Sequence, residues 1–189
     1  MENTKKNALG SLAVGLKLLL ICAIVAAVVA LVFTVTEDAY AQNMEKEKRI
    51  AIEQIFHAGI TPVDLQEQLQ SEFPVYRVEE NGVTVGYCVE VTTPGYGGDI
   101  QMMVGYAPDG SILGVSIVSH SETPGLGDRI TGNEYRDQYV GKSGTLILGD
   151  GDGEIDAISG ATYSSRYVMD GVNKANAVIA QCIAKEAAA

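Results

Sequence analysis

An uncharged apolar run near the N-terminus constrains this chain more than any other feature. Residues Leu18–Val35 read LLLICAIVAAVVALVFTV and carry no charge. A helix rises about 1.5 Å per residue, so this run, extended by the milder stretch Ala8–Leu16, can cross the roughly 30 Å hydrocarbon core of a bilayer. Lysines precede the run and acidic residues follow it, which predicts a cytoplasmic N-terminus. We therefore expect a single transmembrane anchor within residues 1–40, with the remaining chain on the extracytoplasmic side of the cell (inner) membrane.

A cleaved signal peptide is the alternative interpretation of the same run. Ala39-Tyr40-Ala41 has the small-x-small pattern of a cleavage site. The apolar run is longer than the roughly 7–15 residues of a typical signal-peptide core. Glu37 and Asp38 also separate the run from the cleavage pattern. Both observations favour an anchor that is retained.

Charge and cysteine content exclude several classes of function. The net charge is −11, and phosphate neutralisation needs an excess of Lys and Arg, so a nucleic-acid partner is not expected. The three cysteines have no C-x-x-C spacing, and the two histidines, His57 and His120, are far apart in the sequence. A metal site is therefore not expected. For Cys88 and Cys182 we expect buried thiols rather than a disulfide framework.

Helical patterns lie on either side of a region with strand patterns. A charged segment over 42–56 favours a helix. Thr61-Pro62 predicts the start of a second helix, which ends at Phe73 because Pro74 follows. The last predicted helix begins near Ser159 and runs to about Ala187. One apolar face marks this helix, with Val168, Val172, Ala175, Ile179 and Ile183 at spacings of three and four.

Four strands are predicted between these helices. The strongest local signal is Asn81-Gly82 between the runs 75–78 and 83–91, which is typical of a type I′ hairpin. A glycine-rich loop over 92–99 separates this hairpin from two further strands. Those strands cover 100–106 and 112–119, followed by a short helix near 133–139 and a turn at Asp150–Glu154. The sequence thus predicts an α+β fold, with an anchor over 1–40, a helical linker over 41–75 and an antiparallel-sheet domain with flanking helices over 76–189.

The stretch DAISGATYSS, residues 156–165, has the small and hydroxyl residues of a helix N-terminus, with Ser159 as the expected N-cap. The stretch contains no histidine or cysteine that could activate the Thr162 hydroxyl. A helix N-terminus presents unpaired N–H groups and positive potential, which suit a phosphate. Thr162 is therefore either part of an ordinary helix start or a hydroxyl placed to carry a phosphate ester.

Four features together resemble one family. They are SGAT after Asp156, TPGYGG at 93–98, HSETPGLGDRI at 120–130 and the single N-terminal anchor. The chain resembles the G subunit of the Rnf complex, the ion-translocating ferredoxin:NAD oxidoreductase. The related C subunit of the sodium-pumping NADH:quinone oxidoreductase shares the flavin domain. The resemblance covers essentially the whole chain and implies that the sheet domain binds flavin.

The resemblance also implies roles for individual residues. Thr162 would carry FMN through a phosphodiester made by a separate flavin transferase that uses FAD as donor. Asp156, Ser159, Gly160 and Ala161 would complete the motif that the transferase recognises, and Ser164 or Ser165 would hydrogen-bond the phosphate. Loop residues Glu122, Thr123, Gly125 and Leu126 would lie against the isoalloxazine ring, and Tyr96 and Gly97 would border the site.

The resemblance therefore implies an electron relay, a redox component that is not catalytic alone. Its complex would couple electron flow between ferredoxin and NAD to Na⁺ or H⁺ movement, with the other Rnf subunits as partners. The sequence has no nicotinamide fingerprint and no iron–sulfur cysteines, so the flavin would do the redox chemistry. Three alternatives stay open: a relay like the C subunit of the quinone-reducing enzyme, a stand-alone flavoprotein reductase, and an anchored binding domain in which SGAT is only a helix cap.

Overall fold

The computed structural model describes residues 2–149 and 155–186. The chain divides into two compact units, residues 1–46 and residues 47–189, and each is described by itself. The predicted turn at Asp150–Glu154 lies outside the described residues. The predicted boundaries 1–40, 41–75 and 76–189 remain a prediction.

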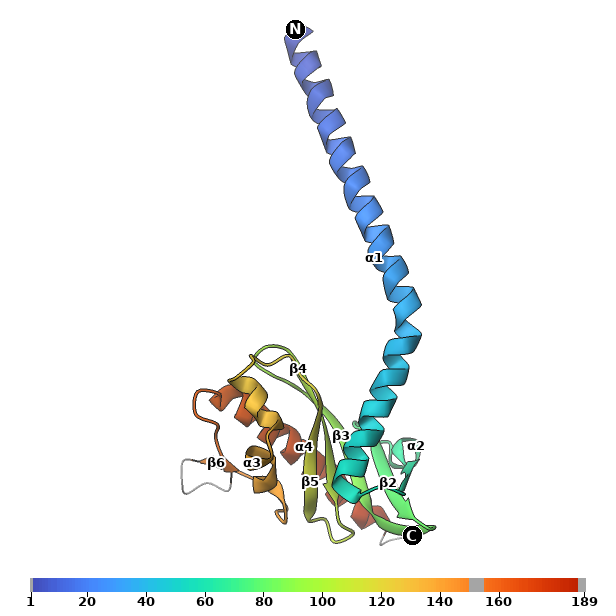
Figure 1. The fold of residues 1–189 in the computed structure, drawn as a ribbon, viewed down its shortest axis with the longest axis vertical. Coiled ribbons are helices and arrows are strands. Elements are labelled where there is room, and N and C mark those ends of the chain that lie inside the picture. Colours follow the sequence, from blue (N-terminus) through green and yellow to red (C-terminus); the bar gives the residue numbers. More distant parts are fainter. Residues whose placement is uncertain (1, 150–154, 187–189) are drawn as a thin grey trace. The chain divides into compact units, whose positions relative to one another are not determined.

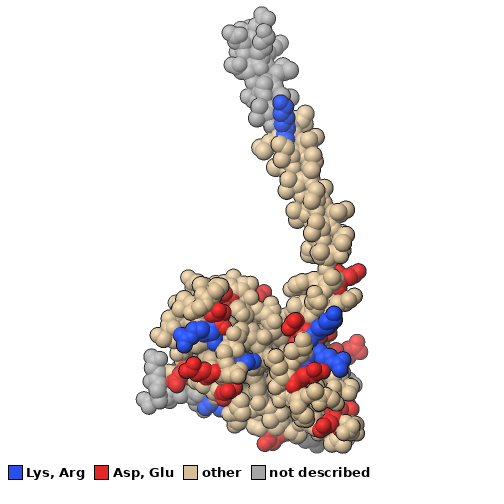
Figure 2. Space-filling model, in the orientation of Figure 1, with Lys and Arg blue, Asp and Glu red and all other residues tan. Residues whose placement is uncertain are grey.

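The first unit is helical. It belongs to α1 (Glu2–Phe56), which continues into the second unit. Among the described residues, α1 is the one helix long and apolar enough to cross a membrane. The large apolar side chains between Leu16 and Val35 are exposed, and the helix carries no charge over a long stretch (Figure 2). Exposed apolar surface of this extent is unfavourable in water and indicates that the helix associates with a membrane.

The second unit is built on one antiparallel sheet with strand order β1-β2-β3-β4-β5 (Figure 1). Its strands are β1 (Thr61–Asp64), β2 (Val75–Glu80), β3 (Val83–Pro94), β4 (Asp99–Tyr106) and β5 (Ile112–Ser119). Asn81 and Gly82 have φ of 52° and 79°, so the predicted Asn-Gly hairpin turn is confirmed. β3 reaches Pro94, so the glycine-rich loop is shorter than the predicted 92–99. With the apolar helix before the sheet and further helices after it, the predicted α+β fold class is confirmed.

The predicted helix over 61–73 is wrong. Thr61–Asp64 forms a fifth strand, and only Gln66–Leu69 is helical (α2). Pro62 pairs with Val78 on the edge strand of the sheet, where a proline need not donate a ladder hydrogen bond. The pattern that predicted a helix start is therefore satisfied by a sheet edge.

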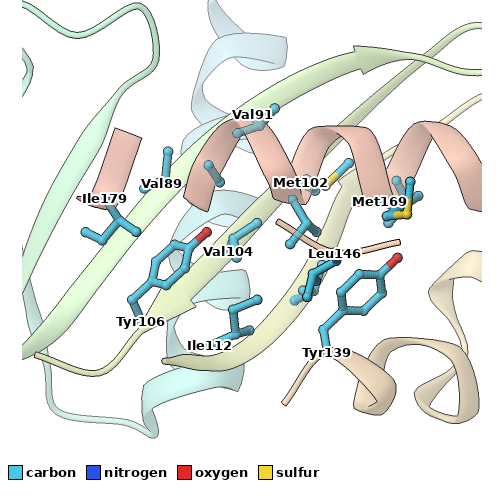
Figure 3. Packing of buried hydrophobic residues seen from close by; sticks show 14 of the residues in the cluster. Val89, Val91, Met102, Val104, Tyr106, Ile112, Tyr139, Leu146, Met169 and Ile179 are labelled. Atoms are coloured by element: carbon cyan, nitrogen blue, oxygen red, sulfur yellow. The ribbon is translucent and has the colours of Figure 1, made fainter. Parts of the chain in front are cut away.

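Both faces of the sheet are covered. Val89 and Val91 of β3 pack into the main core with α4 (Thr162–Glu186), whereas Cys88 packs with Ile52 and Phe56 at the end of α1. Figure 3 shows sheet residues facing Met169 and Ile179 of α4. Successive side chains of β3 thus enter the cores on opposite faces of the sheet, which explains why the sequence of β3 is a nearly continuous apolar run.

The expectation of buried thiols is confirmed. Cys88 and Cys182 are both buried and free, and they lie in different cores. Burial raises the pKa of the Cys88 thiol, and the nearby carboxylate of Glu90 raises it further.

Short elements connect the sheet to α4. They are η1 (Gly127–Thr131), α3 (Asn133–Arg136), η2 (Asp137–Tyr139), β6 (Leu148–Gly149) and β7 (Ile155–Asp156). α3 and η2 together confirm the helix predicted near 133–139. β6 pairs in parallel with β7, so Asp156 ends a strand a few residues before α4 begins.

Gly86→Ala is expected to destabilise the fold by about 2 kcal/mol, as overpacking typically does. A Cβ at Gly86 would overlap the carbonyl oxygen of Tyr106 and lie 2.7 Å from Cε1 of Phe56. Gly114→Ala is the matched control, because its Cβ would lie 3.5 Å from the nearest atoms of Ile55. Urea unfolding of both variants measures the difference. Equal losses would contradict the packing seen at Gly86.

Candidate functional site

Thr162 is the first residue of α4, so the predicted helix start at Ser159 is three residues too early. Ser159 and Gly160 form a turn, and Gly160 has φ of 80°, a left-handed conformation that a right-handed helix does not accommodate. The N–H of Ala161 donates to the carbonyl of Ile158 at 2.9 Å and closes this turn. The turn therefore separates Ser159 from the helix that it was expected to cap.

Ser165 secures this helix start. Its hydroxyl accepts the N–H of Ile158 at 3.0 Å and donates to the carbonyl of Ala161 at 3.1 Å. Its N–H donates to the same carbonyl at 3.0 Å, which is the first bond of the helical ladder. The N–H groups in the turn before it have no preceding helical carbonyl. Within the described residues, no hydrogen bond of the exposed Thr162 hydroxyl is found.

Glu122 joins three segments that are far apart in the sequence. Its side chain is buried, and one carboxylate oxygen accepts the N–H groups of Tyr96 at 2.7 Å and Gly97 at 3.3 Å. The other oxygen accepts the hydroxyl of Ser164 at 2.6 Å. The N–H of Glu122 itself donates to Nδ1 of His120, so this histidine has a structural contact. Glu122 thus ties the β3–β4 loop and the loop after β5 to the first turn of α4.

Glycines allow these segments to approach closely. A Cβ on Gly127 would lie 2.5 Å from Oε2 of Glu122 and 3.0 Å from Oγ of Ser164. A Cβ on Gly97 would overlap the carbonyl of Ser121. The glycines in the two loops therefore make room for the carboxylate and for the neighbouring backbone.

A cavity of about 290 Å³ lies beside Thr162. Most of the predicted site residues meet there: Tyr96, Glu122, Thr123, Leu126, Gly160, Ala161, Thr162 and Ser164. Two lining residues were not predicted, Gly127 and Tyr163. Apart from its position next to Thr162, nothing in the sequence marks Tyr163, because the ring that it contacts at the cavity, that of Tyr96, belongs to a distant loop.

Other predicted residues lie elsewhere. Asp156 and Ser159 line a second cavity of about 450 Å³, together with residues of η1, α3 and η2. Gln138 holds this segment, because its Oε1 accepts the N–H of Asp156 at 2.7 Å. Gly97 adjoins the first cavity through Glu122, whereas Gly125 and Ser165 line neither cavity. The stretch 156–165 thus runs between two cavities, with Thr162 facing the smaller one.

The donor set beside Thr162 fits a flavin mononucleotide. The first N–H groups of a 25-residue helix have no acceptor within the helix and suit a phosphate. Tyr96, Leu126 and Tyr163 are large exposed apolar or aromatic side chains around the same cavity and suit a flat ring. The fold and this site define a flavin-binding domain that follows an apolar N-terminal helix long enough to cross a membrane.

The comparisons with known proteins agree. The family model described as the FMN-binding domain matches residues 95–177. The G subunit of the Na⁺-translocating ferredoxin:NAD⁺ oxidoreductase complex of Acetobacterium woodii is 33% identical, over 84% of this chain and 86% of that protein. The G subunit of the ion-translocating oxidoreductase complex of Methanosarcina acetivorans is 36% identical, over 84% of this chain and 88% of that protein. The chain belongs to the family of G subunits of ion-translocating oxidoreductase complexes.

A solved structure shares the fold. The crystal structure of the C subunit of the Na⁺-translocating NADH-quinone reductase from Parabacteroides distasonis matches with a TM-score of 0.52 and 20% identity. The match covers 63% of this chain and 66% of that chain. At this identity the likeness concerns the fold alone.

Proposed function

We propose that this chain is the covalent-FMN electron carrier of a membrane complex that couples electron transfer between ferredoxin and NAD to translocation of Na⁺ or H⁺. The observation that carries the proposal is the exposed Thr162 hydroxyl at the start of α4, beside a cavity with aromatic walls. The G-subunit relatives at 33% and 36% identity support the type of complex. The other subunits of that complex are the partners.

Thr162 is the attachment point in this proposal. Its Oγ forms a phosphodiester with the ribityl phosphate when a flavin transferase uses FAD as donor. The P–O–P bond of FAD breaks, AMP leaves, and the transferase takes the hydroxyl proton. This activation by another enzyme explains why no base is needed in the stretch 156–165. Asp156 and Ser159 line the second cavity. Together with Gly160 and Ala161, they form the motif that the transferase recognises.

The bound flavin supplies the redox chemistry, since it exchanges one or two electrons. The residues of this chain hold it and limit its exposure to water. The start of α4 offers N–H groups and positive potential to the phosphate. Glu122, Thr123 and Leu126 line the cavity and would border the ring, and Gly125 shapes their loop with φ of 75°. The hydroxyl of Ser164 donates to Glu122, and that of Ser165 donates to the carbonyl of Ala161. A hydrogen bond from either hydroxyl to the phosphate would therefore compete with these contacts within the chain.

The excess of lysine before the apolar run supports a cytoplasmic N-terminus and an extracytoplasmic flavin domain. Covalent attachment suits that location, because a lost cofactor could not be replaced from a cytoplasmic pool. Partner subunits must then carry electrons across the membrane to this domain.

Of the three alternatives, a relay like the C subunit of the quinone-reducing enzyme has less support. The relatives at 33% and 36% identity are G subunits, whereas the C-subunit neighbour shares the fold at 20% identity. A stand-alone reductase would need a substrate-binding module beside the single sheet domain. A binding domain in which SGAT is only a cap does not account for the cavity that the Thr162 side chain lines together with the two loops.

The full chain, produced with a flavin transferase and purified in detergent, is expected to carry flavin through denaturation. In-gel fluorescence after denaturing electrophoresis measures this directly, because only covalently bound flavin stays with the chain. Mass spectrometry should show one added FMN minus one water. A colourless band from chain produced with an active transferase would contradict the proposal.

A further inference from the structure

Two tyrosines beside Thr162 leave most of their side chains in solvent. Tyr96 is 73% exposed and Tyr163 is 60% exposed, whereas Tyr106, Tyr135 and Tyr139 are buried in the core. Large aromatic side chains contribute most to stability when they are buried. An exposed pair at one cavity therefore indicates a surface kept for a ligand rather than for the core.

The two rings form a pair at the cavity. Tyr96 comes from the loop between β3 and β4, and Tyr163 from the first turn of α4. Their centroids lie 6.4 Å apart with an interplanar angle of 32°, within the range of interacting aromatic rings. Both residues line the cavity that Thr162 lines. The pair thus stands next to the hydroxyl that would carry the flavin.

Polar contacts hold both residues in position. The N–H of Tyr96 donates to the buried carboxylate of Glu122 at 2.7 Å. The guanidinium carbon of Arg166 lies 6.0 Å from the centroid of the Tyr163 ring, at the distance of a cation–π contact. The backbone of Tyr96 and the ring of Tyr163 are therefore held before any ligand binds, although little apolar packing surrounds the two rings.

We propose, building on the proposed function, that Tyr96 and Tyr163 form an aromatic wall that contacts the isoalloxazine ring attached through Thr162. The electron-rich phenol rings match the flat, electron-poor flavin ring, and contact would remove apolar surface of all three rings from water. Tyr163 is the new element of this wall, since only the fold brings it into contact with Tyr96.

The wall has a spectroscopic consequence. A flavin excited by light takes one electron from a phenol ring in contact with it, and the electron returns to the phenol without emission. Flavin fluorescence is therefore quenched in the folded protein and recovers when unfolding separates the rings. Phenylalanine keeps the ring shape but is much harder to oxidise, so Tyr→Phe variants remove the quencher and leave the packing.

The test uses the full chain, produced with a flavin transferase and purified in detergent, as wild type, Tyr96→Phe, Tyr163→Phe and the double variant. Tyr167→Phe is the matched control, because Tyr167 lies on α4 but does not line the cavity. The fluorescence yield per flavin is measured in the folded state and again after unfolding in guanidinium. We expect strong quenching in the folded wild type, several-fold recovery in the double variant, and no change in Tyr167→Phe.

Loading is read separately, from flavin absorbance of the unfolded samples. A loaded double variant as quenched as the wild type would overturn the aromatic wall and leave the proposed function standing. A loaded wild type without quenching would do the same. A wild-type chain without bound flavin would overturn the proposed function, and the inference with it.

Discussion

Thr162→Ala is expected to abolish covalent flavin attachment completely while the domain stays folded. The phosphodiester needs the Thr162 oxygen, and the substitution removes it. Stability should change little, because the hydroxyl is exposed and alanine is a favourable helix residue. In-gel fluorescence after denaturing electrophoresis measures attachment, and a urea unfolding curve measures stability.

Thr92→Ala is the matched control for attachment. Thr92 is an exposed threonine on β3 that lines neither cavity, and its variant should load flavin like the wild type. Thr162→Ser keeps a hydroxyl and tests whether the transferase requires the methyl group. Fluorescence that persists in Thr162→Ala, or disappears in Thr92→Ala, would sink the assignment of the attachment site.

Glu122→Ala is expected to lower the free energy of unfolding by about 3 kcal/mol, since hydrogen bonds to a charged group are worth about 1.5–3 kcal/mol each. Glu122 is 5% exposed, and its carboxylate accepts hydrogen bonds from Tyr96, Gly97 and Ser164. Its removal would leave the buried Ser164 hydroxyl without this acceptor. Urea unfolding of the full chain in detergent, followed by tyrosine fluorescence, measures the loss.

Glu134→Ala controls for the loss of a carboxylate as such, because Glu134 is exposed. Glu122→Gln should lie between the two, since an amide oxygen can still accept from the Tyr96 N–H while the amide group donates to Ser164. A loss for Glu122→Ala no larger than that for Glu134→Ala would show that the three segments are held together by other contacts.

Local signals in the sequence predicted the elements with strong chemistry of their own. Asn81-Gly82 predicted its hairpin, because few residue pairs adopt two positive φ values at low cost. The spacing of Val168, Val172 and Ala175 predicted the buried face of α4. Thr61-Pro62 and Ser159 were each predicted to start a helix, and in both cases the tertiary context gave a different result. A sheet edge made the first a strand, and the Gly160 turn moved the helix start to Thr162.

The sequence by itself determined the apolar N-terminal helix and the short motif around Thr162. Both features depend only on residues that are adjacent in the sequence. A membrane span depends on the length of one apolar run, and a helix start depends on the first residues of that helix. Only the tertiary structure decided what surrounds that threonine. Glu122 meets Ser164 across 42 positions of sequence, and Tyr163 meets Tyr96 from another loop. Such contacts depend on how the whole sheet places its loops against α4. A local sequence pattern does not predict which distant residues come into contact.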